Sequence, residues 1–239
     1  MIFRHDHEMY QQFPSLRAGV LWVDGIGPSA DITNAIAPYL ERARSRLALS
    51  PESEFPEIQA WRRAFSQMGL KPTQYRCASE SLLRRFRKEG DLPSLHPLID
   101  LYNAVSLAYA IPVCALDVRQ ISGNLTVRPA DGSERYLSFA GDVQTPEVGE
   151  IVFADDAGNA HARRWSNRQS GLSAIRPDTT QVLIVTEALH ADAESDIRDL
   201  VEHLAADIAT IWETTPLTAM LNVTTSEVTF PIEEQSVEA

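Results

Sequence analysis

Residues 96–134 read HPLIDLYNAVSLAYAIPVCALDVRQISGNLTVRPADGSE, and this stretch decides the fold. Apolar residues recur between positions 98 and 109 at the spacing of a largely buried helix, and Pro112 ends that helix. Further along, the Gly123-Asn124 and Asp131-Gly132 pairs mark turns. Three β segments are therefore expected after the helix: 113–116, 125–128 and 134–138.

The rest of the chain frames this stretch with helices and strands. Strands are expected at 18–24, 150–154, 162–165 and 181–187, and helices at 31–49, 57–68, 79–88 and 191–212. The 239 residues and the 44% hydrophobic content support one domain with a substantial core, over residues 1–215. Residues 216–239 contain acidic but no basic side chains, so we expect an acidic, partly disordered tail there.

Several residues of the deciding stretch follow the order of a known family. They are Pro97, Asp100, Asn103, Pro112, Ala115 and Asp117, then Arg128 and Asp131-Gly132-Ser133-Glu134. This order resembles the B3/B4 domain of the bacterial phenylalanyl-tRNA synthetase beta subunit, with the likeness extending from about residue 73 to 171. The resemblance implies an α/β (α+β) fold with a mixed central sheet flanked by helices. In that family the domain hydrolyses the ester of an amino acid wrongly attached to tRNA.

Within this resemblance, Glu134 and Cys114 are the candidate catalytic residues. Glu134 matches the family's editing glutamate, and its alternative role is that of a turn residue. Cys114 stands where the family has a histidine. It could act as a thiolate nucleophile if nearby arginines lowered its pKa, or it could be an inert lining residue.

Residues 163–171, RRWSNRQSG, form the densest polar segment of the chain. Arginines there could grip a phosphate or a carboxylate, and Trp165 could stack on a base or ring; a surface hairpin end is the alternative. The expected substrate-binding residues are Asn103, Asp117, Arg128, Trp165, Arg168 and Gln169. If these residues serve one function with Glu134 and Cys114, the fold must bring them around one concavity.

Residues 61–90 are basic although the chain as a whole is acidic. The formal net charge of −12 argues against indiscriminate binding, so neither DNA nor a membrane is expected as a partner. Eight basic residues against two acidic ones in this segment could nevertheless hold tRNA, or they could form a solvated helix face. The expected RNA-binding residues are Arg84, Arg85, Arg163 and Arg164.

Neither a metal nor another cofactor is expected. The six histidines include no H-x-x-x-H or HExxH pattern, and Cys77 and Cys114 lie far apart in the sequence. The sequence contains no G-x-S-x-G elbow and no P-loop. The cysteine usage fits a reducing cytoplasm better than a disulfide scaffold, and no apolar run approaches the roughly 18 residues that span a bilayer.

The resemblance and the polar residues together favour one function with one rival. The favoured function is binding of the aminoacylated 3′ end of a tRNA and hydrolysis of a mischarged amino acid in trans. The rival is a non-catalytic module that binds tRNA or a free amino acid. Cys114 favours the rival, whereas Glu134 and the arginine-rich segment favour the enzyme.

Overall fold

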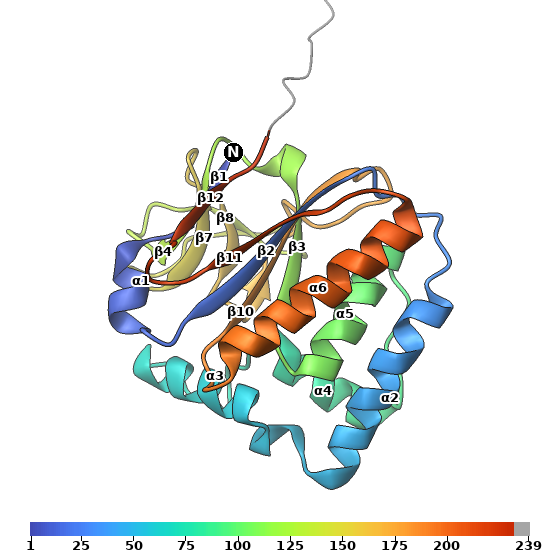
Figure 1. Cartoon of the computed structure of the whole chain (residues 1–239). Helices are drawn as coiled ribbons and strands as arrows, with labels where there is room; N and C mark the ends of the chain where they lie inside the picture. The colour runs from blue at the N-terminus through green and yellow to red at the C-terminus, as the bar shows by residue number, and fades with distance from the viewer. Residues whose placement is uncertain (232–239) are drawn as a thin grey trace, which may run out of the picture.

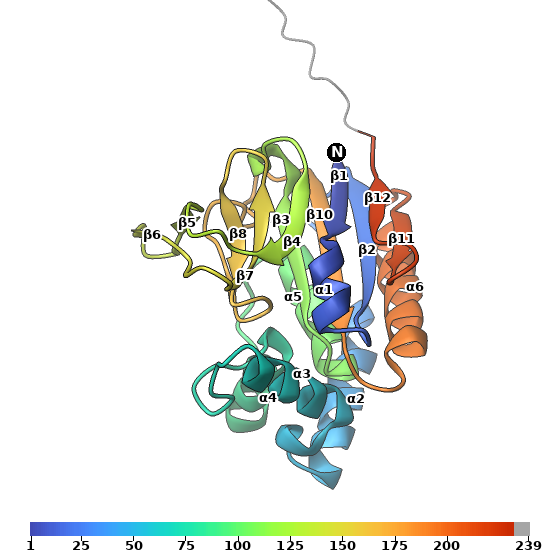
Figure 2. The same cartoon turned by 90° about the vertical axis from the view of Figure 1, so that its left-hand side faces the viewer.

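Two β-sheets pack face to face, and helices cover the outer face of the smaller sheet (Figure 1). The structure is a computed structural model that describes residues 1–231. The larger sheet has the strand order β12-β1-β4-β7-β8-β9, and the smaller has the order β11-β2-β10-β3. A short hairpin, β5-β6, stands beside the larger sheet (Figure 2). This arrangement confirms the expected α/β class with a mixed sheet flanked by helices.

The larger sheet is mixed because β1 and β4 run parallel while its other neighbours are antiparallel. Its strands are β1 (Ile2–His5), β4 (Leu125–Pro129), β7 (Ile151–Asp155), β8 (Ala160–Arg163), β9 (Arg168–Gln169) and β12 (Glu227–Thr229). The smaller sheet is antiparallel throughout. Its strands are β2 (Arg17–Asp24), β3 (Val113–Asp117), β10 (Gln181–Ala188) and β11 (Leu217–Leu221). The hairpin consists of β5 (Tyr136–Leu137) and β6 (Val143–Gln144).

Six helices within residues 1–231 complete the fold, and two of them cover the outer face of the smaller sheet. The helices are α1 (His7–Gln12), α2 (Thr33–Leu49), α3 (Pro56–Gln67), α4 (Ala78–Glu89), α5 (Pro97–Tyr109) and α6 (Ala193–Trp212). Short 3₁₀ turns lie at Glu52–Glu54 and Val118–Gln120. Helices α5 and α6 cover the sheet, and α2 packs on α5 (Figure 1). None of the helices in residues 1–231 is long and apolar enough to cross a membrane.

Strand β10 separates two hydrophobic cores, so both of its faces are buried. Val182 and Ile184 belong to the core beneath α5 and α6, whereas Leu183 and Val185 belong to the core between the sheets. Successive side chains of a strand point to opposite faces, which explains this division. The same alternation directs the side chain of Glu187 towards the space between the sheets.

Helix α5 confirms the expected boundaries of the deciding stretch. The His96 side chain accepts a hydrogen bond from the Leu98 amide at the helix start, and Pro97 occupies the first turn. At the other end Ala110 adopts a left-handed conformation with φ of 56° before Pro112. Strand β3 follows at once, as predicted.

Three expectations about boundaries are wrong. The strand expected at 134–138 is reduced to β5, because Glu134 closes a tight turn by accepting hydrogen bonds from the amides of Asp131 and Gly132. The strand expected at 162–165 ends at Arg163, and the next two residues form a turn with positive φ. The expected tail from residue 216 contributes β11 and β12, which pair with β2 and β1. The end of that expected tail, residues 232–239, lies outside the described residues.

Candidate functional site

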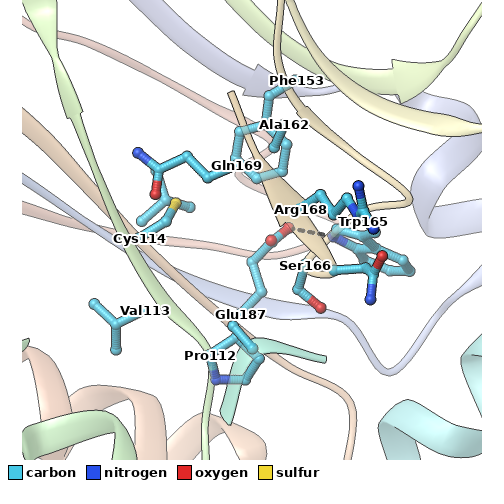
Figure 3. Close-up of a pocket in the computed structure, with 13 residues that line it drawn as sticks. Pro112, Val113, Cys114, Phe153, Ala162, Trp165, Ser166, Arg168, Gln169 and Glu187 are labelled. Atoms are coloured by element: carbon cyan, nitrogen blue, oxygen red, sulfur yellow. Dashed lines mark hydrogen bonds between the residues drawn. The ribbon is translucent and has the colours of Figure 1, made fainter. Parts of the chain in front are cut away.

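A cavity of about 80 Å³ lies between the two sheets, next to the edge strand β3 (Figure 3). In the same measure one water needs roughly 10–15 Å³, so the cavity has room for several waters or for a small side chain. Its walls come from β3, β7, β8, β10 and the 165–169 segment. The lining residues are Ala78, Pro112, Val113, Cys114, Phe153, Ala162, Trp165, Ser166, Asn167, Arg168, Gln169, Val185 and Glu187.

Trp165 forms one wall of the cavity and is fully buried. Its backbone is left-handed, with φ of 55°, and its amide donates to the carbonyl of Ile151 at 2.8 Å. The indole ring packs against Phe13 and Trp61, with centroids 4.8 Å away in each case. Because its ring is already enclosed, Trp165 is not free to stack on a base, contrary to the expectation from sequence.

Glu187 supplies the only carboxylate among the residues that line this cavity. Its Oε1 accepts a hydrogen bond from Trp165 Nε1 at 3.0 Å and lies 2.7 Å from His5 Nε2. Because His5 is on β1 and Glu187 is on β10, the contact with His5 links the two sheets. The Oε2 atom of Glu187 accepts no hydrogen bond from any residue in the range 1–231. The sequence reading passed over Glu187, although a charged residue at an inward position of an apolar strand was an available signal.

The hydroxyl of Ser166 is a second polar group without a partner. Its Oγ is buried and makes no hydrogen bond to any described residue. By contrast, Gln169 donates from Nε2 to the carbonyl of Ala115 at 2.8 Å, and Asn167 donates to the carbonyl of Arg76 at 2.7 Å. Buried polar groups are normally paired, so an unpaired hydroxyl on a cavity wall indicates a place for a water or a ligand atom.

Cys114 lies on β3 and faces the same cavity (Figure 3). Burial, reinforced by the negative charge of Glu187, raises the pKa of the Cys114 thiol to about 12. Within the described residues no arginine forms a hydrogen bond to the thiol. The side chain is therefore protonated near neutral pH, which favours the inert lining residue over the thiolate nucleophile.

Glu134 does not line this cavity, so the prediction of a single concavity is wrong. Its Oε1 accepts from Arg128 Nη1 at 2.5 Å and from the Asp131 amide at 3.1 Å, and its Oε2 accepts from the Gly132 amide at 3.1 Å. Arg128 alternates with Val127, which faces the space between the sheets, so the pair lies on the other face of the larger sheet. This position matches the alternative reading of Glu134 as a turn residue.

Asp117 and Asn103 also lie away from the cavity. Asp117, at the end of β3, accepts hydrogen bonds from Arg119 and from the Thr179 hydroxyl. Burial acts to raise the pKa of Asp117, but these hydrogen bonds outweigh it and lower the pKa overall. Asn103, on α5, lines a different hollow beside α2, together with Asp91 and Asp100. The residues that the structure does bring together from the predicted set are Cys114, Trp165, Arg168 and Gln169.

All four arginines expected to bind RNA have partners within the fold. Arg84 contacts Glu52 and Arg85 contacts Glu89, at 3.4 and 2.8 Å. Arg163 is buried and donates to both oxygens of Glu150. The guanidinium of Arg164 stacks over the ring of Tyr75, 4.9 Å from its centroid. For the basic segment, the contacts of Arg84 and Arg85 favour the alternative of a solvated helix face that finds its counter-charges within the fold.

One trio of side chains in residues 1–231 could hold a metal ion by proximity: Glu57, His190 and Asp196. Their ligand atoms lie within 4.8 Å of one another. However, Arg46 Nη2 already donates to both oxygens of Glu57, at 2.7 and 2.9 Å. His190 Nε2 is likewise 2.8 Å from Asp196. A cation would have to compete with Arg46, so the trio is better described as a charge network than as a metal centre.

Comparison with known proteins identifies the domain type. The model of the B3/4 domain family matches residues 60–203, which includes every residue of the cavity wall. The phenylalanine–tRNA ligase beta subunit of Shewanella oneidensis is 27% identical over 123 residues, which cover 51% of this chain and 15% of that protein. The same-named subunit of Streptomyces avermitilis is 30% identical over 129 residues, covering 54% of this chain and 15% of that protein.

The chain thus spans about one sixth or less of the length of these curated relatives. Among solved structures, an N-terminal fragment of the phenylalanyl-tRNA synthetase beta subunit from Pyrococcus horikoshii is similar, with a TM-score of 0.48 and 8% identity. That match covers 91% of this chain and 53% of the fragment. At this score the likeness carries no argument about function.

Proposed function

This chain belongs to the B3/4 domain family, and from that premise we propose that it binds the aminoacylated 3′ end of a tRNA and hydrolyses the ester of a mischarged amino acid in trans. One observation carries the proposal: a mainly apolar cavity is lined by a carboxylate, Glu187, one oxygen of which accepts no hydrogen bond within residues 1–231. The matched relatives are named as tRNA ligase subunits, which supports a charged tRNA as the source of the ligand.

The cavity suits the side chain of an amino acid. Its apolar walls, formed in part by Val113, Phe153 and Val185, favour burial of carbon atoms. Glu187 Oε2 can then accept a hydrogen bond from a hydroxyl or ammonium group of the bound amino acid. A site built to accept such a bond rejects ligands that lack the donor, because the buried carboxylate would otherwise stay unpaired.

Hydrolysis of an activated ester requires a positioned water and donors for the developing oxyanion. Glu187 and the unpaired Ser166 hydroxyl are the groups on the cavity wall that can hold such a water. Cys114 does not need to attack, since its raised pKa keeps it as a thiol. In this mechanism the chain places and polarises a water, and the leaving group is the ribose hydroxyl of the tRNA.

A non-catalytic binding module is the second candidate. The contacts of Glu187 favour it, because two neighbouring donors, from His5 and Trp165, already share Oε1. A carboxylate held in this way recognises a ligand without accepting its proton. Glu187 would then hold an amino acid while the ester remained intact.

A panel of correctly and incorrectly charged tRNAs separates the two candidates. The protein is mixed with each radiolabelled aminoacyl-tRNA, and release of the amino acid is followed alongside equilibrium binding. Faster release from one or more mischarged tRNAs, with the correctly charged tRNA spared, is the result expected of an editing enzyme. Binding without release would support the non-catalytic binding module. The absence of both binding and release would contradict both candidates.

A further inference from the structure

A second, open hollow of about 470 Å³ adjoins the cavity at the β5-β6 hairpin. Asn167, Arg168 and Gln169 line both spaces, so the hollow lies at the mouth of the cavity. Its volume falls in the range of roughly 300–1,000 Å³ that is typical of small-molecule sites. The hairpin stands out from the larger sheet in Figure 2 and forms the outer wall of the hollow.

An exposed aromatic ring is held in place on this wall. Phe139 is 73% exposed, although it lies only two residues beyond the end of β5. The turn that carries it is ordered, since the Ser138 hydroxyl accepts from the amides of Ala140 and Asp142, both at 3.2 Å. At its base the Gly171 amide donates to the Leu137 carbonyl at 2.9 Å. A Cβ at Gly171 would lie 3.1 Å from the Ser138 carbonyl oxygen, so a larger residue would crowd this contact.

The side chain of Arg168 lies on the other side of the hollow. Arg168 is exposed and makes no ion pair with any residue in the described part of the chain. Its neighbours in sequence differ, because Arg163 is paired with Glu150 and Arg164 lies over Tyr75. Arg168 and the exposed ring of Phe139 line the same hollow. Together they supply the two features with which proteins bind single-stranded nucleic acid: a positive group for phosphate and a ring for stacking.

We infer that this hollow is the binding site for the 3′-terminal nucleotide of an RNA, with the base stacked on Phe139 and the phosphate held by Arg168. The inference rests on the proposed function, because an amino acid seated in the cavity is esterified to a ribose that must lie at the cavity mouth. Asp142, on the hairpin turn, can accept a hydrogen bond from a ribose hydroxyl or an exocyclic amine. The site therefore positions the ester at the boundary between the hollow and the cavity.

The test of stacking uses uncharged oligoribonucleotides. A short RNA ending in CCA should bind the wild-type protein more tightly than the same RNA ending in CC, measured by fluorescence titration. Phe139→Ala should weaken binding of the CCA form by at least about fivefold, the lower scale for loss of one base-aromatic stack. Val143→Ala is the matched control, because Val143 is 67% exposed on the same hairpin and does not line the hollow. Equal binding of both RNAs, or an unaffected Phe139→Ala variant, would overturn the site.

The test of the phosphate contact uses salt. Arg168→Ala should weaken binding and reduce the slope of log affinity against log salt by roughly 0.7, the value for one phosphate contact to a single strand. Arg198→Ala makes the same change in net charge on α6, where Arg198 lies 3.5 Å from Glu194, and should leave both quantities unchanged. A slope that falls equally in both variants would mean that net charge alone acts, and would contradict a contact at Arg168.

These measurements separate the inference from the proposed function. Uncharged RNA needs no hydrolysis, so a protein that releases no amino acid from any charged tRNA can still show binding that depends on Phe139. That outcome would contradict the proposed editing activity and support the nucleotide site. A Phe139→Ala variant that releases a mischarged amino acid and binds the CCA RNA with unchanged affinity would support the editing activity and contradict the nucleotide site.

Discussion

Two buried glutamates, in two regions of the molecule, have opposite surroundings. Glu134 lies on the outer face of the larger sheet, where Arg128 and two backbone amides occupy both of its oxygens. Glu187 lies between the sheets, where both of its donors share one oxygen and the other borders a cavity. Their exposed fractions, 0% and 4%, are nearly equal. Burial alone therefore does not distinguish the two carboxylates, whereas the pairing of their oxygens does.

The comparison also explains why each glutamate is present. A buried charge costs free energy unless its partners are complete, and Glu134 has a complete set that closes the 131–134 turn. Glu187 lacks such a set, so its environment retains a capacity to bind. Ser166, whose hydroxyl is also unpaired, lies on the wall of the same cavity. A ligand in this cavity can therefore complete the hydrogen bonding of both groups.

The largest expected effect follows removal of the fully paired glutamate. Glu134→Ala leaves the Arg128 guanidinium and two turn amides without their acceptor, so the free energy of unfolding should fall by about 3 kcal/mol, the lower scale for breaking a buried ion pair. Urea denaturation followed by circular dichroism measures this change. Ser133→Ala, an exposed substitution in the same turn, is the control and should cost much less. A loss below about 1 kcal/mol for Glu134→Ala would mean that the turn does not depend on this carboxylate.

Removal of the charge at Glu187 should instead affect chemistry. Glu187→Gln keeps an oxygen acceptor for His5 and Trp165, so the fold should persist, while deacylation of a mischarged tRNA should slow by about a hundredfold. Single-turnover release of the labelled amino acid measures this rate.

The matched control for Glu187 is Thr186→Val on the same strand. Thr186 points to the opposite face, towards Ile197 and Val201 of α6, and its buried hydroxyl has no partner among residues 1–231. The valine variant should keep the wild-type rate. Equal rates for Glu187→Gln and the wild type would place the active carboxylate elsewhere.

A smaller effect is expected at Cys114. With its pKa raised to about 12, the thiol stays protonated at pH 7, so Cys114→Ser should change the deacylation rate by less than about threefold. Iodoacetamide should modify Cys114 slowly at pH 7 and faster only as the pH approaches 12, as measured by mass spectrometry. Rapid modification at pH 7, together with an inactive Cys114→Ser variant, would indicate that Cys114 acts as a thiolate nucleophile.

The smallest effect is expected from the basic helix. Arg84 and Arg85 already contact Glu52 and Glu89, so the double variant Arg84→Gln with Arg85→Gln should change tRNA affinity by less than about twofold. Filter binding at several salt concentrations measures the affinity and its salt slope. A large loss of affinity with a reduced slope would show that these arginines leave their partners and contact phosphate.

The local sequence was enough to predict many of the helices and strands. The 3.6-residue spacing of apolar side chains in α5, the proline after it and the short apolar runs of β3 and β10 are properties of neighbouring residues, so their elements were predictable. The order of Asn103, Asp117, Arg128 and Glu134 also indicated the family. Strands that depend on a partner far away in the sequence were not predicted. Examples are β11, which pairs with β2, and β12, which pairs with β1.

Which polar residues share a site depends on the tertiary structure. Glu134 and Cys114 are 20 positions apart in the sequence, yet a sheet separates them, whereas Glu187 and Trp165 meet through a hydrogen bond of 3.0 Å. The reason is that the direction of a side chain depends on strand register and on the packing of the two sheets. Whether an oxygen is paired depends further on donors brought from β1 and from the 165–169 segment, and no local pattern in β10 records them.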